Sequence, residues 1–133
     1  MSIAEALFKM DPELEEETIR LLNSVSLFLD EGEPRPEALR MQELRTAKYN
    51  ALALQGELNM ENVRDFRQSA EAFLDTSNLP LVLDVNGIEF VDSTGLGAII
   101  NLVFEARRRG KKLFVLRPSL MLQVLLDQCL RTV

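Results

Sequence analysis

The sequence contains no histidine and no tryptophan, and it has one cysteine, Cys129, and one tyrosine, Tyr49. Without histidine, the chain cannot build a Ser-His-Asp or Cys-His catalytic arrangement or a histidine-ligated metal site. A single cysteine cannot form an internal disulfide bond. The scarcity of aromatic rings and a net charge of −6 argue against nucleic acid as a partner.

Long apolar runs are also lacking. No stretch approaches the ~20 apolar residues of a membrane span. The N-terminus has neither the basic start nor the apolar region of a secretory signal. We therefore expect a cytoplasmic protein with no membrane span. Because no calcium-loop spacing is present, we expect neither a metal nor another cofactor.

What the chain does have is an uneven distribution of charge. Residues 1–36 carry nine acidic and three basic residues, a net charge of −6. The other 97 residues hold the remaining 12 of the 21 acids and 12 of the 15 bases, so their net charge is zero. Apolar residues recur here at helical spacing, so residues 1–36 are predicted to be an acidic amphipathic helical extension. The stripe consists of Leu14, Thr18, Leu21, Leu22, Val25, Phe28 and Leu29. A homodimer through these helices is one way to cover it.

Residues 37–133 are predicted to form a second unit of α/β class, with a mixed sheet and crossover helices. Alternating or apolar runs predict strands at 39–45, 51–58, 81–85 and 112–116. Helices are predicted from Asn59 or Asn62 to about residue 77, from the Gly95 region to Gly110, and from Ser119 onward. The last helix is expected to turn Leu122, Val124, Leu125 and Leu130 inward, with Cys129 in the core.

The most informative segment is the strand-to-helix junction Asp92-Ser93-Thr94-Gly95-Leu96-Gly97. Each of its first three side chains could cap the helix, a contribution of about 1 kcal/mol, and that purely structural role is one interpretation. The other is that the junction presents a hydroxyl for phosphorylation, because a helix N-terminus favours negative charge. Gly95 and Gly97 each cost up to ~1 kcal/mol relative to alanine inside a helix. We expect their missing side chains to leave the hydroxyls accessible.

This junction resembles the signature of STAS domains, and specifically of bacterial anti-sigma factor antagonists. The Gly56-Glu57-Leu58-Asn59 segment is similar to the Gly-Glu-Leu-Asp turn of that family, with Asn59 in place of the usual aspartate. The resemblance implies a STAS-like fold and phosphorylation of Ser93, with Thr94 as second choice, by an anti-sigma factor that is also a kinase. A partner-binding surface would then comprise Asp92, Ser93, Thr94, Gly95, Leu96 and Gly97, with Asn59, Asn86 and Gly87 on the same rim.

The function implied is partner switching, in which the unphosphorylated protein sequesters the kinase and a phosphatase resets the switch. The alternative is a non-catalytic STAS subunit of a signalling or lipid-transport assembly. Catalysis by a carboxylate pair such as Asp84 and Asp92 is a third possibility. We expect no enzyme, because no nucleophile–base pair is evident.

The chain departs from the family at both ends. The family normally continues into a further short strand and a helix, which are missing after Val133, and simple members lack residues 1–36. We expect the N-terminal amphipathic helix to pack where that C-terminal helix would lie, in its own chain or in a partner.

Overall fold

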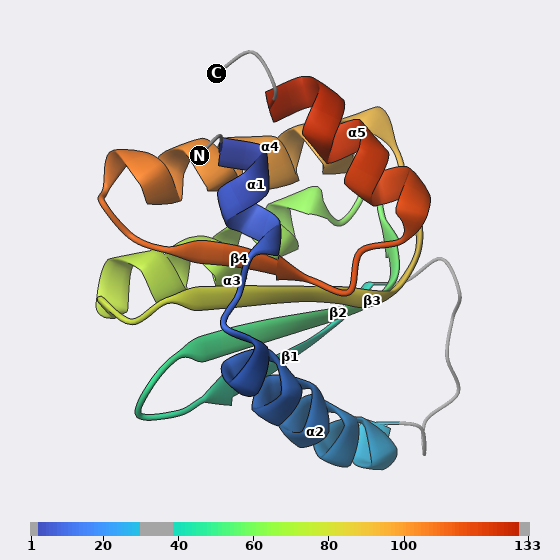
Figure 1. Cartoon of the computed structure of the whole chain (residues 1–133). Coiled ribbons are helices and arrows are strands. Elements are labelled where there is room, and N and C mark those ends of the chain that lie inside the picture. The colour runs from blue at the N-terminus through green and yellow to red at the C-terminus, as the bar shows by residue number, and fades with distance from the viewer. Residues whose placement is uncertain (1–2, 30–38, 131–133) are drawn as a thin grey trace.

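The computed structural model describes residues 3–29 and 39–130, which form one sheet flanked by helices (Figure 1). The elements are α1 (Ile3–Phe8), α2 (Pro12–Leu29), β1 (Leu39–Arg45), β2 (Asn50–Leu58), α3 (Val63–Thr76), β3 (Leu81–Val91), α4 (Ser93–Arg108), β4 (Leu113–Leu116) and α5 (Leu120–Leu130). The predicted α/β class with N-terminal helices is confirmed. The predicted end of the extension, at residues 30–36, lies outside the described residues.

The sheet is mixed, with strand order β1-β2-β3-β4. β1 and β2 are antiparallel and are joined by a tight turn in which the Thr46 hydroxyl donates to the Tyr49 carbonyl at 2.7 Å. β2, β3 and β4 are parallel, so α3 and α4 are the crossover helices that parallel pairing requires. The carboxyl ends of β2 and β3 therefore meet at one edge, where α3 and α4 begin.

β3 is longer than the predicted 81–85, because the polar pair Asn86-Gly87 does not end it. Along β2, Ala53 pairs with Asp84 but Gln55 pairs with Gly87, which leaves one extra residue in β3, a bulge. A side chain on Gly87 would place its Cβ 2.9 Å from the Leu54 carbonyl oxygen. Glycine therefore lets β2 approach closely, and the strand continues to Val91.

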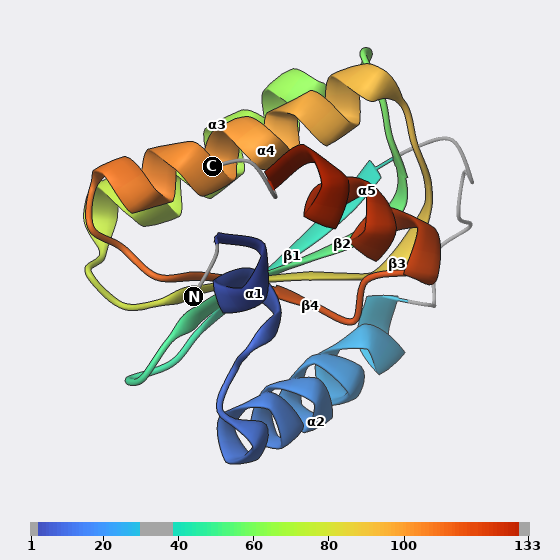
Figure 2. The ribbon, with the colours of Figure 1, turned by 45° about the horizontal axis from the view of Figure 1, so that its top comes forward.

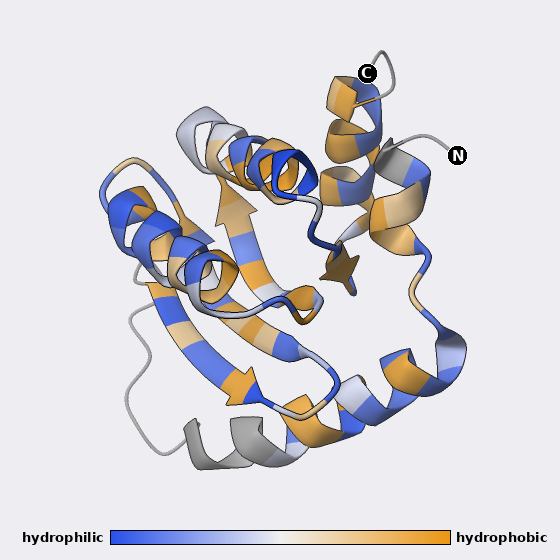
Figure 3. Cartoon of the chain, turned by 90° about the vertical axis from the view of Figure 1, so that its left-hand side faces the viewer, coloured by the Kyte–Doolittle hydropathy of each residue, from blue (hydrophilic) through white to orange (hydrophobic). Residues whose placement is uncertain are grey.

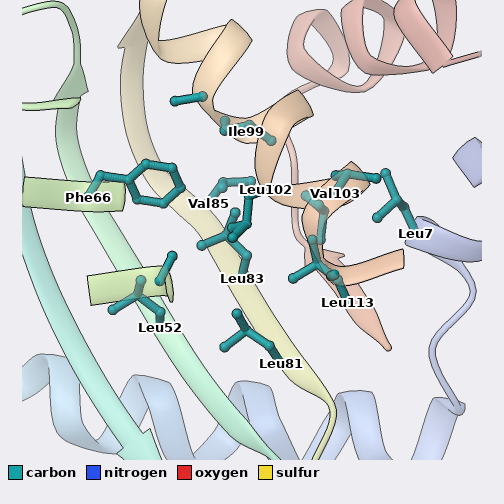
Figure 4. Packing of buried hydrophobic residues seen from close by; sticks show 14 of the residues in the cluster. Leu7, Leu52, Phe66, Leu81, Leu83, Val85, Ile99, Leu102, Val103 and Leu113 are labelled. Atoms are coloured by element: carbon teal, nitrogen blue, oxygen red, sulfur yellow. The ribbon is translucent and has the colours of Figure 1, made fainter. Parts of the chain in front are cut away.

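The main core lies between the sheet and helices α3, α4 and α5. Figure 4 shows Leu52 and Leu83 of the sheet facing Phe66 of α3 and Ile99 of α4. α5 buries Leu122, Leu126 and Leu130, which recur every four residues. The predictions for two other residues of α5 are wrong: Val124 is 44% exposed and Cys129 is exposed. This helix is apolar on most sides, so periodicity alone could not select its inner face.

The opposite face of the sheet is covered by α2, as Figures 2 and 3 show from two directions. Leu22 packs in a second cluster with Tyr49 of the β1–β2 turn, Val82 of β3 and Leu116 of β4. Thr18 is fully buried, and its hydroxyl donates to the Leu14 carbonyl at 2.6 Å. Of the extension's apolar stripe, Leu14 and Leu22 thus pack against its own sheet, and Thr18 is buried. A homodimer remains a prediction, and it would have to use another surface of these helices.

A buried ion pair joins β3 to Arg117, which follows β4, and the same arginine is hydrogen-bonded to α2. Asp84 is 4% exposed and accepts from Arg117 Nη2 at 2.7 Å, while Arg117 Nη1 donates to Asn23 Oδ1 of α2 at 3.1 Å. Arg117 adopts a φ of +53°, a left-handed conformation that costs about 1 kcal/mol or more for a residue with a side chain. The ion pair offsets that cost, because Asp84 without it would be a buried unpaired charge.

We expect Leu22→Ala to lower the free energy of unfolding by about 2–5 kcal/mol, because Leu22 is 1% exposed beneath α2. Ser24→Ala, on the exposed side of the same helix, should change it by less than ~0.5 kcal/mol. Urea denaturation followed by circular dichroism measures both. Equal stability of the two variants would show that α2 contributes no packing.

Candidate functional site

The candidate site is the junction between β3 and α4, and Asp92 organises it. The Asp92 Oδ1 atom accepts from the Gly95 backbone N–H at 2.7 Å, which caps α4. The Oδ2 atom accepts from the Met60 N–H at 3.0 Å, and the Asp92 N–H donates to the Leu58 carbonyl. One carboxylate therefore ties the start of α4 to the β2–α3 loop.

The two glycines of the junction have different roles. A Cβ on Gly95 would lie 2.5 Å from the Leu58 carbonyl oxygen, so glycine is needed for α4 to pack against the end of β2. A Cβ on Gly97 would meet nothing within 4 Å. The expectation that both glycines expose the hydroxyls is therefore wrong for Gly95, which is buried, and fits only Gly97.

Ser93 and Thr94 occupy the first two positions of α4, and both are exposed. In the described part of the chain, neither hydroxyl has a hydrogen-bond partner, because Asp92 supplies the cap. Their backbone N–H groups belong to the orphan donors of a helix start, where the dipole favours negative charge. Of the two interpretations of these hydroxyls, the capping role falls to Asp92, and the fold makes no use of Ser93 Oγ.

The structure brings only some of the predicted rim residues to this junction. Asn59 belongs to the loop that Asp92 holds: its side-chain oxygen accepts from the Glu61 N–H at 2.9 Å, and its backbone N–H donates to Asn62 Oδ1. Asn86 and Gly87 lie inside β3, five and four residues before its end. At about 3.3 Å per residue they are roughly 15 Å from the junction along the strand. The sequence pattern did not indicate this position, because the polar pair Asn86-Gly87 was interpreted as the end of the strand.

Two apolar side chains at the junction had not been predicted. Met60, next to Asn59 and bonded through its N–H to Asp92, is 71% exposed. Phe90, two residues before Asp92, is 54% exposed. They are two of the five large hydrophobic side chains that are exposed in the described residues. The sequence Ile88-Glu89-Phe90-Val91 did not indicate that Phe90 is exposed. A second register shift, near Glu57, changes which residues of β3 face the core.

The carboxylate pair of the enzymatic interpretation is not brought together. Asp84 faces Arg117 under α2 and Asp92 caps α4, eight residues further along the chain and roughly 25 Å along the strand. Even in glycoside hydrolases, the paired catalytic carboxylates lie only about 5–9.5 Å apart. Over residues 3–29 and 39–130, no cluster of acidic residues and cysteine has the arrangement of a metal site. The junction can offer an acceptor hydroxyl and a contact surface.

The family model described as "Mlab, STAS domain" matches residues 41–129 of the chain. This range covers the sheet, α3, α4 and most of α5, and it includes the whole junction. Comparison with curated protein sequences gives no match.

Solved structures with the same fold include the anti-sigma factor antagonist SpoIIAA. Its unphosphorylated form is 19% identical, with a TM-score of 0.56 over 66% of this chain and 80% of that chain. The phosphorylated form of the Bacillus cell fate determinant SpoIIAA is 18% identical, with a TM-score of 0.58 over 69% and 83%. The murine anion transporter Slc26a9 is 19% identical, with a TM-score of 0.54 over 79% of this chain and 20% of that chain. No described helix here has the length and apolar character to cross a bilayer.

We expect opposite effects from alanine at the two glycines. Gly95→Ala should lower the free energy of unfolding by about 1–3 kcal/mol or more, because its Cβ would meet backbone. Gly97→Ala should raise it by up to ~1 kcal/mol, because open space lies beside it and alanine favours the helix. Urea titrations of both variants measure this. A Gly95→Ala protein as stable as Gly97→Ala would contradict the close packing on Leu58.

Proposed function

The chain belongs to the STAS domain family, and we propose that it is a non-catalytic anti-sigma factor antagonist controlled by phosphorylation of Ser93. In the unphosphorylated form it binds an anti-sigma factor that is also a serine kinase. Phosphorylation releases the kinase, and a phosphatase restores binding. The setting of this switch is the bacterial cytoplasm.

The proposal rests on the different roles of Asp92 and Ser93 at the start of α4. Asp92 holds the turn with both carboxylate oxygens, whereas the Ser93 hydroxyl is exposed and bonds to nothing in the described structure. A phosphate on Ser93 would add about −1.5 to −2 charges at the surface without breaking a bond of the fold. A switch of this kind requires a small change in the fold and a large change in the interface.

The docking surface that we propose consists of Met60, Phe90, Ser93, Thr94 and Gly97. Ser93 and Gly97 are four residues apart on α4 and so share a face of the helix. The open space at Gly97 lets a partner approach that face closely. Met60, bonded through its N–H to Asp92, and Phe90, two residues before Asp92, supply exposed apolar contact area at the same end of the sheet. A phosphate among these groups would place a strongly hydrated charge in the contact.

Ser93→Asp should lose the kinase in a pull-down from lysate of the native host, while Ser93→Ala should retain it and resist phosphorylation. Asn101→Asp adds the same charge to an exposed position of α4 two turns away and should bind like the unmodified protein. Mass spectrometry identifies the captured proteins. Equal capture by Ser93→Asp and Ser93→Ala would contradict the switch.

Gly97→Leu tests the docking surface without adding charge. Because nothing lies within 4 Å of a Cβ at this position, the variant should keep its stability, while its affinity for the captured kinase falls at least about tenfold. Titration calorimetry with the purified partner measures the affinity, and thermal unfolding provides the stability control. Unchanged affinity would place the contact elsewhere.

A second candidate function is a permanent subunit of a signalling or lipid-transport assembly. It is favoured by three adjacent exposed side chains at the start of α5: Leu120 at 79%, Met121 at 74% and Val124 at 44%. Permanent interfaces are more hydrophobic than transient ones. In that case, the same scaffold or membrane-associated partners would be captured by the unmodified protein and by Ser93→Asp.

A further inference from the structure

A hollow of about 410 Å³ lies at the other end of α4, between that helix, α1 and β4. Figure 2 shows α1 beside the edge strand β4. Arg107, on its rim, is 14 residues from Ser93, or roughly 21 Å along the helix axis. The hollow is therefore separate from the proposed docking surface.

The inner wall of the hollow is apolar. Leu7 of α1, Val103 of α4 and Leu113 of β4 converge on it, as Figure 4 shows. Ala6, which is exposed, borders this wall at the surface, and Phe114 lines the hollow from the edge strand while packing on the α2 face of the sheet. A volume of this size falls within the range of small-molecule sites, which are mostly apolar with a few placed polar groups.

The rim of the hollow is cationic, although the chain as a whole is acidic. Lys9, Arg107, Lys111 and Lys112 all line it, and none of the acidic residues in the described ranges does. None of the four has an ion-pair partner among the described residues.

The neighbouring arginines differ, because Arg108 and Arg109 both pair with Glu105. Hydrogen bonds from Arg108 and then Arg109 hold the pKa of Glu105 below its ordinary value. Arg108 and Arg109, which do not line the hollow, are thus paired with a carboxylate, whereas the four cations around the hollow have no such partner among the described residues. Four like charges around one opening repel one another, and a bound anion would relieve that repulsion.

We propose that this hollow binds a small amphiphilic anion, a short alkyl chain with a carboxylate or phosphate head. The alkyl chain lies against Leu7, Val103 and Leu113, and the head is held between Lys9, Arg107 and Lys111. The acidic extension contributes to the site directly, because α1 supplies Leu7 and Lys9. The site does not depend on phosphorylation of Ser93 or on the kinase.

The test uses titration calorimetry of the full chain with decanoate and decyl phosphate, both below their micelle-forming concentrations. We expect saturable binding of one molecule per chain. Decyl maltoside, which has a neutral head, and inorganic phosphate, which has no tail, should bind at least about tenfold more weakly. Binding of either control as tightly as decyl phosphate would overturn the assignment.

Lys111→Glu should weaken decyl phosphate binding at least about tenfold, because it reverses a charge on the rim. Lys48→Glu makes the same change of net charge in the β1–β2 turn, outside the hollow, and should leave affinity within about twofold. Ala6→Phe, at an exposed position of α1, should fill the hollow and block both ligands without unfolding the chain. Equal affinities of the Lys111 and Lys48 variants, or undiminished binding by Ala6→Phe, would overturn the proposal.

Discussion

The geometry of the candidate site depends on the carboxylate of Asp92. Its two oxygens accept from Gly95 and Met60, so a single side chain fixes both the first turn of α4 and the loop that follows β2. This arrangement works only because Gly95 has no Cβ to strike the Leu58 carbonyl. Because Asp92 holds the turn, the Ser93 and Thr94 hydroxyls make no hydrogen bond in the described structure. Their exposure is a consequence of the cap, and it allows the hydroxyl to change chemically while the fold does not.

The sheet beneath the junction is covered on both sides by its own chain. α3, α4 and α5 pack on one face, and α2 covers the other through Leu22. Arg117, paired with Asp84 of β3 and hydrogen-bonded to Asn23, adds a polar contact between the sheet and α2. The acidic extension thus forms a layer of the structure, and its α1 also closes the edge of the sheet beside β4, where an uncovered strand would invite pairing with other chains.

The sequence predicted the order of strands and helices well, because alternation, helix caps and glycine stops are local signals. It also located the junction, whose residues are consecutive. It failed where the outcome depends on tertiary packing. The bulge that carries β3 through Asn86-Gly87 is set by pairing with β2, and the inner face of α5 is set by contact with α1 and α4. For the same reason, nothing in the sequence indicated that Met60 and Phe90 stay exposed beside Asp92, or that four cations gather around one hollow.

The central claim is that Ser93 controls partner binding. The most direct test is to isolate the protein from its native host, separate the free from the partner-bound fraction, and map phosphate in each by peptide mass spectrometry. The account predicts phosphate on Ser93 in the free fraction and none in the bound fraction. An unmodified Ser93 in both fractions, or phosphorylated Ser93 within the complex, would contradict it.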